Sequence, residues 1–230
     1  MTTRILIIPA RKGSTRIKNK NIKKFNGKPI IAYSILAAKK SKLFNKIHVS
    51  TNCKKIKKIS TLQGVKFDFY RPEKLSKNNV PIFDVLKHVI KTFSNKKIYF
   101  DEIWCLLPCS PLIKSFDLIN VVKKIKKKKI KKPILSVASY PVPLKWAFEM
   151  KNNSKLNPLK KDAHLISSAH IQKNYYDTGN FYIFDHSHIL TNTSKTINNK
   201  FYGYKIPNYK AVDIDELDDW DIALKLSKID

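Results

Sequence analysis

Short apolar runs alternate with longer amphipathic segments along most of the chain, and this alternation constrains the fold more than any other feature. Buried strands are predicted over residues 4–9, 46–51, 65–70, 102–108 and 134–140. Helices are predicted between them, over residues 29–40, 54–64, 82–93 and 115–127. Strands separated by helical crossovers usually pair in parallel. We therefore expect an α/β fold, a mostly parallel sheet with helices on both faces.

Residues 141–178 interrupt this alternation, because they contain several turn signals and few clear apolar runs. They predict a small inserted arm, either an antiparallel excursion or a segment that contacts another subunit. Beyond the arm, strands are predicted over 180–185, 202–207 and 210–215, and a final helix over 216–229. A chain of 230 residues can bury one substantial core, so we expect residues 1–230 to form a single domain that carries the arm.

The charge of the chain is strongly positive, with 46 Lys and Arg against 17 Asp and Glu and a net charge of +29. Such a charge suggests nucleic acid or another anionic partner. The excess is nearly all lysine, however, and it is spread along the chain without the aromatic interleaving of single-strand binders. We expect no nucleic-acid partner, and a basic nucleic-acid-binding protein is kept as a distant alternative.

The chain has neither membrane nor secretion signals. No apolar run approaches the ~18 residues that span a bilayer, and the first residues do not match a signal peptide. The three cysteines, Cys53, Cys105 and Cys109, form no Cys-x-x-Cys pair, and no second pair of zinc ligands is evident. Free thiols suit a reducing compartment. We expect a cytoplasmic protein without a membrane partner.

The loop after the first strand, residues 11–21, is dense in positive and hydroxyl side chains. Open parallel sheets bind ligands beyond the carboxyl ends of their strands, where this loop is expected to lie. Gly13 permits a close backbone approach, Ser14 offers a hydroxyl, and Arg11 and Lys20 can neutralise a polyphosphate. The pattern fits neither a Walker loop nor a dinucleotide fingerprint. It predicts an anion-binding loop, with an ordinary solvated basic turn as the alternative.

Asp213 and Asp215 lie two positions apart on the predicted strand 210–215, so their side chains are expected on one face. A cation between them would relieve their repulsion, and oxygen-only ligation with few protein ligands suits Mg²⁺. Acidic residues also favour a helix start, which accounts for Asp218 and Asp219 but not for Asp213. A phosphate loop with an acidic metal pair indicates phosphoryl or nucleotidyl transfer.

Six segments occur in an order that identifies a family. They are "IIPARKGSTRIKNKNIKKFNGKPIIAYSI" (7–35), "VST" (49–51), "RPEKLS" (71–76), "LLPCSPL" (106–112), "DTGNFYIF" (177–184) and "VDIDELDDW" (212–220). In this order they resemble the bacterial cytidylyltransferases that activate nonulosonic acids, the CMP-sialic acid synthetase family. The resemblance covers nearly the whole chain, and its first and last motifs are the most specific.

The resemblance implies a Rossmann-like nucleotidyltransferase fold and a homodimer in which the inserted arm reaches the partner. It also implies transfer of CMP from CTP to the anomeric hydroxyl of a nonulosonic acid, with release of pyrophosphate. Arg16, "DTGNFY" and Trp220 favour pseudaminic acid as the acceptor, whereas "PLKW" (143–146) is more similar to the N-acetylneuraminate enzymes. Departures at Asn19 and Leu107 bear on sugar choice, so N-acetylneuraminate, legionaminate and 3-deoxy-octulosonate remain alternatives.

The resemblance further implies a role for each matching residue. The implied catalytic residues are Arg11, Lys20 and Asp213, with Lys20 stabilising charge on the pyrophosphate. The implied nucleotide contacts are Arg11, Gly13, Ser14, Lys20, Asn21, Arg71, Ser76 and Ser110. The candidate sugar contacts are Lys145, Gln172, Asp177, Phe181 and Tyr182. Asp213 and Asp215 would hold the Mg²⁺ cofactor.

Overall fold

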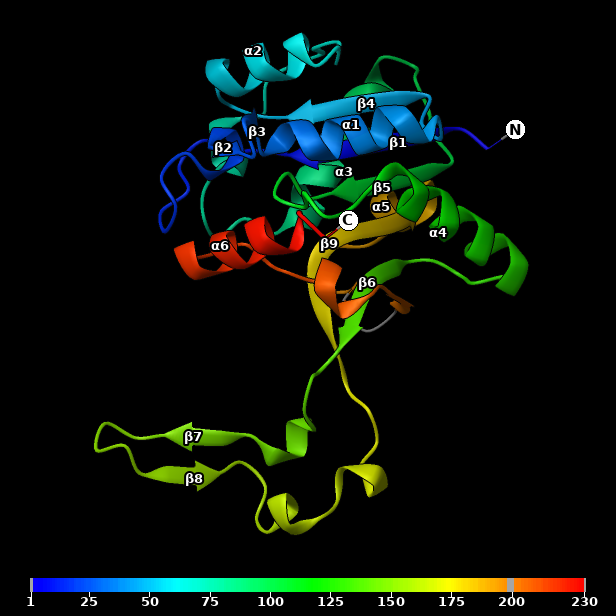
Figure 1. Cartoon of the computed structure of the whole chain (residues 1–230). Coiled ribbons are helices and arrows are strands. Elements are labelled where there is room, and N and C mark those ends of the chain that lie inside the picture. Colours follow the sequence, from blue (N-terminus) through cyan, green and yellow to red (C-terminus); the bar gives the residue numbers. More distant parts are fainter. Residues whose placement is uncertain (1, 198–200, 230) are drawn as a thin grey trace.

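A six-stranded sheet organises the chain, and the computed structural model describes residues 2–197 and 201–229 of it (Figure 1). The strand order is β10-β6-β9-β5-β1-β4. Five strands run in one direction: β1 (Arg4–Pro9), β4 (Lys46–Ser50), β5 (Glu102–Leu106), β6 (Ile134–Ser139) and β10 (Tyr202–Lys205). Strand β9 (Tyr175–Asp185) lies antiparallel between β5 and β6. The predicted mostly parallel sheet is confirmed.

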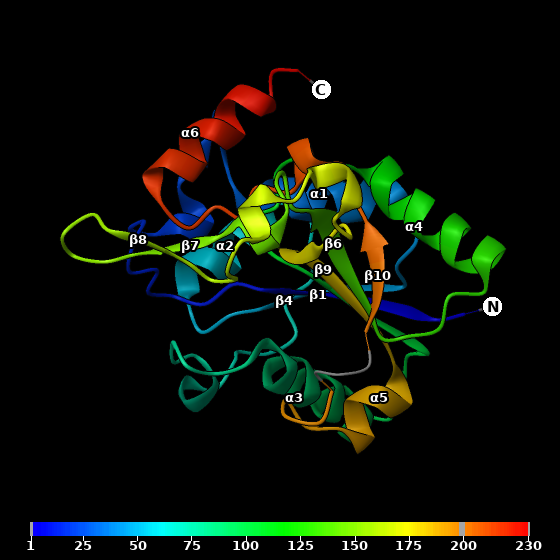
Figure 2. The ribbon, with the colours of Figure 1, turned by 90° about the horizontal axis from the view of Figure 1, so that it is seen from below.

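Helices cover both faces of the sheet, also as predicted (Figure 2). Helices α1 (Ile31–Ser41) and α4 (Ser115–Lys128) pack together on one face, and α3 (Ile82–Asn95) and α5 (His186–Thr191) on the other. Strand β1 joins both cores, because Leu6 and Ile8 face the α1 side while Ile5 and Ile7 face the α3 side. All four side chains are fully buried, which explains the uninterrupted apolar run in the sequence.

A third, smaller core lies outside the sheet and packs residues 17–30 against residues 214–223. It contains Phe25 from the short hairpin of β2 (Lys24–Phe25) and β3 (Lys28–Pro29), and Trp220 from α6 (Leu217–Leu226). The two rings meet edge to face with their centroids 5.5 Å apart. Ile17 and Ile214 are buried in the same cluster. These contacts hold the segment before α6 against the loop that follows β1.

Two predicted strands are wrong, and one predicted helix begins later than expected. Segments 65–70 and 210–215 pair with no other strand. Their apolar side chains are buried individually instead. Val65 packs in the core beside α2 (Lys54–Leu62), and Ile214 packs in the third core. The first helix begins at Ile31, since Pro29 belongs to β3.

Residues 140–174 leave the sheet between β6 and β9 and form an arm that projects away from the rest of the protein (Figure 1). The arm contains the hairpin of β7 (Phe148–Met150) and β8 (Leu156–Pro158), together with three short 3₁₀ turns. Strand β9 begins at Tyr175, which pairs with Ser139 at the end of β6. The predicted start at residue 180 is therefore too late, and the β6–β9 pair forms the base of the arm.

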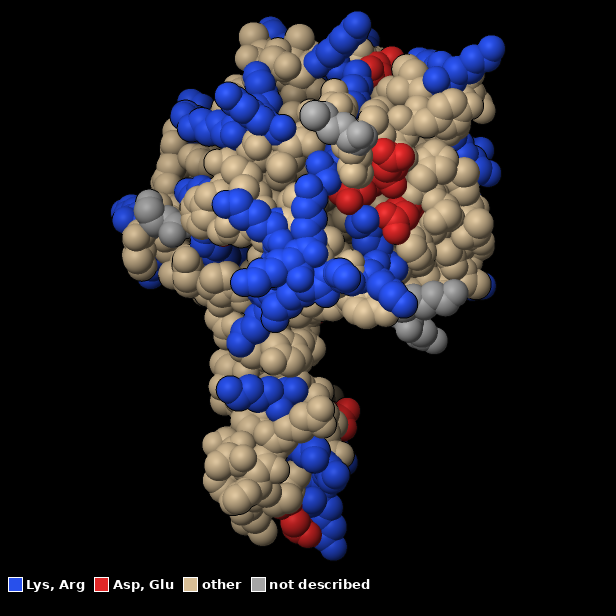
Figure 3. Space-filling model, turned by 90° about the vertical axis from the view of Figure 1, so that its right-hand side faces the viewer, with Lys and Arg blue, Asp and Glu red and all other residues tan. Residues whose placement is uncertain are grey.

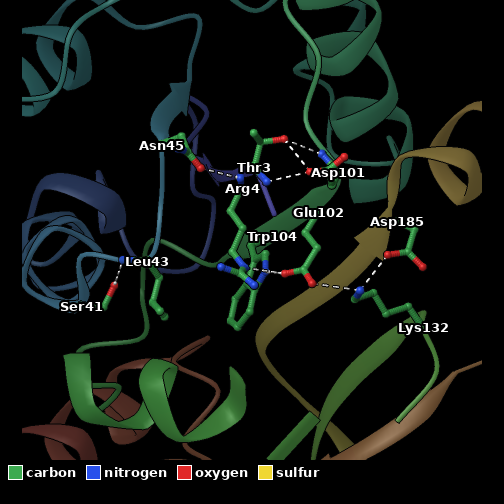
Figure 4. Close-up of polar contacts among 10 residues, drawn as sticks. All are labelled: Thr3, Arg4, Ser41, Leu43, Asn45, Asp101, Glu102, Trp104, Lys132 and Asp185. Carbon is green, nitrogen blue, oxygen red and sulfur yellow. Dashed lines mark hydrogen bonds and ion pairs between the residues drawn. The ribbon is translucent and has the colours of Figure 1, made fainter. Parts of the chain in front are cut away.

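At the end of the sheet opposite the strand-exit loops, a buried ionic cluster joins neighbouring strands (Figure 4). Glu102 on β5 accepts a hydrogen bond from Arg4 Nε at 2.6 Å and pairs with Lys132 Nζ at 3.0 Å. Lys132 also donates to Asp185 at the end of β9, at 2.7 Å. Burial alone would raise the pKa of Glu102, but these cationic partners outweigh it and lower that pKa. The cluster fixes β1, β5 and β9 at the end away from the site.

None of the helices in the described part of the chain is long and apolar enough to cross a membrane.

Candidate active site

A cavity of about 310 Å³ lies at the carboxyl ends of β1 and β5. The first loop contributes Arg11, Ser14, Thr15, Arg16, Ile17, Lys20 and Asn21 to its lining. The loop after β5 contributes Ser110, β9 contributes Gly179 and Asn180, and the segment before α6 contributes Asp213 and Asp215. The basic loop and the acidic pair, predicted independently from sequence, therefore share one cavity.

Two ion pairs join the basic loop directly to the acidic segment. Arg16 Nη2 lies 2.6 Å from Asp215 Oδ2, and Lys20 Nζ lies 3.0 Å from Asp215 Oδ1. Lys20 also donates a hydrogen bond to the backbone carbonyl of Ile214. Arg16 and Asp215 are 199 positions apart in sequence. Only the packing of α6 on the first loop brings them together.

The remainder of the loop is held by its own backbone. Arg11 Nη1 donates to the carbonyl of Gly13 at 2.9 Å and to that of Lys12 at 3.3 Å. Asn21 Nδ2 donates in turn to the carbonyl of Arg11 at 3.0 Å. Gly13 has a φ of 92°, a conformation that glycine adopts without a side-chain penalty. Gly13 lines a small hollow behind the loop rather than the main cavity.

The two carboxylates of the acidic pair have different environments. Among the residues described, Asp213 makes no side-chain hydrogen bond or ion pair, and burial together with the charge of Asp215 raises its pKa. Burial would also raise the pKa of Asp215, but hydrogen bonds and charge from Lys20 and Arg16 outweigh it and lower that pKa. The cavity thus contains one unengaged carboxylate and one with a cation on each oxygen.

Gly179 lets Asp213 lie directly against β9. This glycine has a φ of 61°, and a Cβ added there would lie 3.4 Å from Asp213 Oδ2. Nearby, Asp177 accepts hydrogen bonds from the Gly179 amide at 2.8 Å and from the Tyr182 hydroxyl at 2.7 Å. Burial, reinforced by Asp177, raises the pKa of Tyr182, which therefore stays a neutral hydroxyl. A register shift in the β6–β9 pairing accompanies this local geometry.

The oxygen donors of Asp213 and Asp215 fit a cation of the Mg²⁺ type. Mg²⁺ commonly takes one or two carboxylates and completes its shell with waters and substrate phosphates. The described residues include no group of three or more His, Cys, Asp or Glu side chains that could hold a metal. Mg²⁺ binding by Asp213 and Asp215 stays a prediction. Asp219 is not a third ligand, because its carboxylate accepts the backbone amides of Asp215 and Glu216 at 2.9 and 2.8 Å and caps α6.

Two predicted nucleotide contacts lie away from the cavity wall. Arg71 is only 5% exposed and donates to the carbonyl and hydroxyl of Ser50, at 2.6 and 3.1 Å. Burial lowers the pKa of Arg71 to about 10, and the charge of Arg11 contributes in the same direction. Ser76 is buried, and its hydroxyl donates to the carbonyl of Pro72 at 3.2 Å. Contacts of Arg71 and Ser76 with nucleotide therefore remain predictions.

Among the predicted sugar contacts, Phe181 places its side chain in the core, so its contact with a sugar stays a prediction. Its side chain is fully buried and packs on Trp104 and Tyr204, with ring centroids 6.3 and 5.9 Å away, because the alternation along β9 directs it into the core. Lys145 and Gln172 lie on the arm and do not line the cavity. Asp177 and Tyr182 form the hydrogen-bonded pair beside Gly179.

Sequence reasoning missed two features of the site. Cys109 lines the cavity, with its thiol 3.4 Å from Asn21 Oδ1, and burial raises its pKa to about 12. Its sequence signal is its place within the family segment 106–112, next to the predicted contact Ser110. The contact of Gly179 with Asp213 joins residues far apart in the chain, so nothing local to either residue predicts it.

Comparisons with known proteins agree with this architecture. The cytidylyltransferase family model matches residues 5–222, and the chain belongs to this family. The chain is 28% identical to the pseudaminic acid cytidylyltransferase of Campylobacter jejuni subsp. jejuni serotype O:23/36 (strain 81-176), over 98% of this chain and 96% of that protein. It is 28% identical to CMP-N,N'-diacetyllegionaminic acid synthase of Legionella pneumophila, with the same coverage of 98% and 96%.

Solved structures share the fold. CMP:2-keto-3-deoxy-manno-octonic acid synthetase complexed with CTP matches 99% of each chain with a TM-score of 0.68, at 13% sequence identity. The predicted family and the Rossmann-like nucleotidyltransferase fold are confirmed.

The positive φ of Gly179 and its contact with Asp213 generate a prediction about activity. Gly179→Ala places a methyl group at a positive φ and against the Asp213 carboxylate, so we expect it to lose about 1 kcal/mol of stability and also to lower cytidylyltransferase activity. Gly27→Ala is the matched control, because Gly27 has a φ of 80° with nothing within 4 Å. It should lose similar stability and keep its activity. Urea unfolding and pyrophosphate release measure the two effects, and equal activities in the two variants would contradict the role of the Gly179–Asp213 contact.

Proposed function

We propose that this protein transfers CMP from CTP to the anomeric hydroxyl of a nonulosonic acid and releases pyrophosphate. The observation that carries the proposal is the convergence of the basic loop and the acidic pair on one cavity, in a chain of the cytidylyltransferase family. The acceptor class follows from relatives named for pseudaminic, legionaminic and acylneuraminic acids. We favour pseudaminic acid on the motif resemblance at Arg16, "DTGNFY" and Trp220, since overall identity does not separate the pseudaminic from the legionaminic acid enzymes, each 28% identical over 98% of this chain.

The first loop supplies the groups that a triphosphate requires. Arg11, Ser14, Lys20 and Asn21 line the cavity and offer cationic, hydroxyl and amide donors. The anomeric hydroxyl attacks the α-phosphorus in line, a new oxygen–phosphorus bond forms, and the bond to pyrophosphate breaks. Negative charge then grows on the departing pyrophosphate, where fixed cations such as Lys20 lower the barrier. Asp213 and Asp215 would hold Mg²⁺, which when bound would act as a Lewis acid and neutralise charge on the phosphates.

The surface charge of the protein favours capture of these substrates. Positive charge extends even to the side of the molecule away from the cavity, where Figure 3 shows Lys and Arg side chains gathered at the junction of the body and the arm and acidic side chains confined to small groups. CTP and a sugar acid are both anions, so a positive field raises their rate of encounter with the protein. Attraction of anionic substrates would account for the excess of lysine without a nucleic-acid partner. We place the protein in the cytoplasm, since its three cysteines are free thiols.

We further propose a homodimer in which the arm of one subunit completes the site of the other. Leu165, Met150 and Leu159 on the arm are 74%, 68% and 67% exposed. Apolar side chains grouped at such exposure mark an interaction surface. Lys145 and Gln172 also lie on the arm, outside the cavity of their own chain. They would reach a sugar acid only across a subunit interface, where the cationic Lys145 would pair with the sugar carboxylate.

The proposed reaction is tested by a substrate panel. We expect pyrophosphate release from CTP only when a sugar acid is present, fastest with pseudaminic acid and slower with N-acetylneuraminate, legionaminate and 3-deoxy-octulosonate. The release should stop when EDTA removes Mg²⁺ and should be weak with ATP, GTP or UTP. Fastest turnover with another sugar acid would overturn the choice of acceptor, and no turnover with any of them would overturn the proposed reaction.

The proposed dimer is tested with two leucines of equal exposure. Leu165 on the arm and Leu62 on α2 are both 74% exposed. We expect wild type to sediment at twice the 26.7 kDa chain mass, Leu165→Glu to shift toward monomer because a charge enters the apolar contact, and Leu62→Glu to stay dimeric. A monomeric wild type, or equal effects of the two substitutions, would contradict this assignment.

A further inference from the structure

Every cation that the first loop presents to the cavity is already bonded to an acceptor within the protein. Arg11 donates to the carbonyls of Lys12 and Gly13, and Lys20 to the carbonyl of Ile214 and to Asp215. Arg16 pairs with Asp215. If these cations are to bind a triphosphate, as the proposed function requires, some of these contacts must be exchanged.

The Arg16–Asp215 pair is the contact most easily exchanged. The Arg16 side chain is 57% exposed and that of Asp215 37%, against 19% for Lys20. Loss of an ion pair with such exposure changes an equilibrium constant by only about 1.4-fold to fivefold. The backbone of Asp215 is fixed separately, because its amide donates to Asp219 in the cap of α6. The Asp215 side chain can therefore change partners while its backbone stays in place.

The same pair obstructs the metal site. Asp215 has Arg16 on Oδ2 and Lys20 on Oδ1, at 2.6 and 3.0 Å, so a divalent cation must displace or face two positive groups to reach it. Asp213 has no such partner among the described residues. A cation that enters without nucleotide therefore meets only one readily available carboxylate, and like charges repel it.

We propose that Arg16 is a positioning residue that holds Asp215 in the nucleotide-free protein and passes to the triphosphate when CTP binds, which opens the divalent-cation site. This inference rests on the proposed function. A triphosphate offers a guanidinium several anionic oxygens in place of one carboxylate and is the stronger partner. Departure of Arg16 frees Asp215 Oδ2 while Lys20 stays at Oδ1, so Asp213 and one oxygen of Asp215 become available to a cation beside the phosphates. By linkage, CTP and the divalent cation raise each other's affinity, and Arg16 contributes to that coupling.

The experiment measures Mn²⁺ binding to the nucleotide-free protein by electron paramagnetic resonance of free Mn²⁺. We expect Arg16→Gln to bind Mn²⁺ more tightly than wild type, by up to about fivefold, the upper end of what loss of an exposed ion pair allows. Arg16→Lys keeps the charge and should return toward the wild-type affinity. In an Asp215→Asn background, Arg16→Gln should not raise the Mn²⁺ affinity further, because the Arg16–Asp215 ion pair is already lost.

Arg11→Gln is the matched control for charge alone. It removes one positive charge from the same cavity, but Arg11 contacts loop carbonyls and not Asp215. Its gain in Mn²⁺ affinity should be clearly smaller. Failure of Arg16→Gln to bind Mn²⁺ more tightly than wild type, or an equal gain in Arg11→Gln, would overturn the proposal.

A separate titration with CTP in EDTA distinguishes this inference from the proposed function. We expect Arg16→Gln to bind CTP more weakly than wild type, since it has lost a phosphate partner. Equal CTP affinity would overturn the exchange. A wild type that binds Mn²⁺ but no CTP would overturn the proposed function, while the Mn²⁺ comparison would still report whether Arg16 obstructs the metal site.

Discussion

The candidate site depends on a small apolar core that is separate from the sheet. Trp220 on α6 packs against Phe25 beside the first loop, with Ile17 and Ile214 buried around them. Truncating a buried aromatic side chain of this kind typically costs about 3–5 kcal/mol. This packing places the segment before α6 against the loop after β1. Without it, Asp215 would not reach Arg16 and Lys20, and the cavity would lose its acidic wall.

Charge balance then determines what the cavity can accept. A cluster of cations from the first loop faces two carboxylates. In the nucleotide-free protein, contacts with Asp215 and with backbone carbonyls offset the repulsion among these cations. Asp213 stays unengaged among the described residues, and Gly179 leaves space for it against β9. Under the proposed function, a magnesium nucleotide would bring both a polyanion and a dication and would replace these internal contacts with matching external ones. The arm adds the further groups that a sugar acid needs, if a second subunit presents them.

The sequence predicted most of the fold, because a buried parallel strand and an amphipathic helix each have a local periodicity that residues 4–9 and 82–93 display. The strand predictions failed at 65–70 and 210–215. Individual apolar side chains are buried there, but neither segment pairs with a neighbouring strand, and the local sequence does not indicate that such a partner is absent. The first loop was predictable from its place at a strand exit. Asp213 and Asp215 reach the cavity, but through the packing of α6 rather than through a shared strand face. A motif match does not reveal which face of β9 a side chain occupies, so the burial of the Phe181 side chain could not be predicted from the sequence.

The central claim is that the first loop and the acidic segment bind the same triphosphate. Crystals grown with CTP and Mn²⁺ test it directly, because anomalous scattering locates the metal independently of the phosphates. The account predicts one Mn²⁺ within bonding distance of Asp213, about 2.0–2.3 Å, with the triphosphate lying along residues 11–21. A metal bound away from Asp213 and Asp215, or a triphosphate outside this cavity, would contradict it.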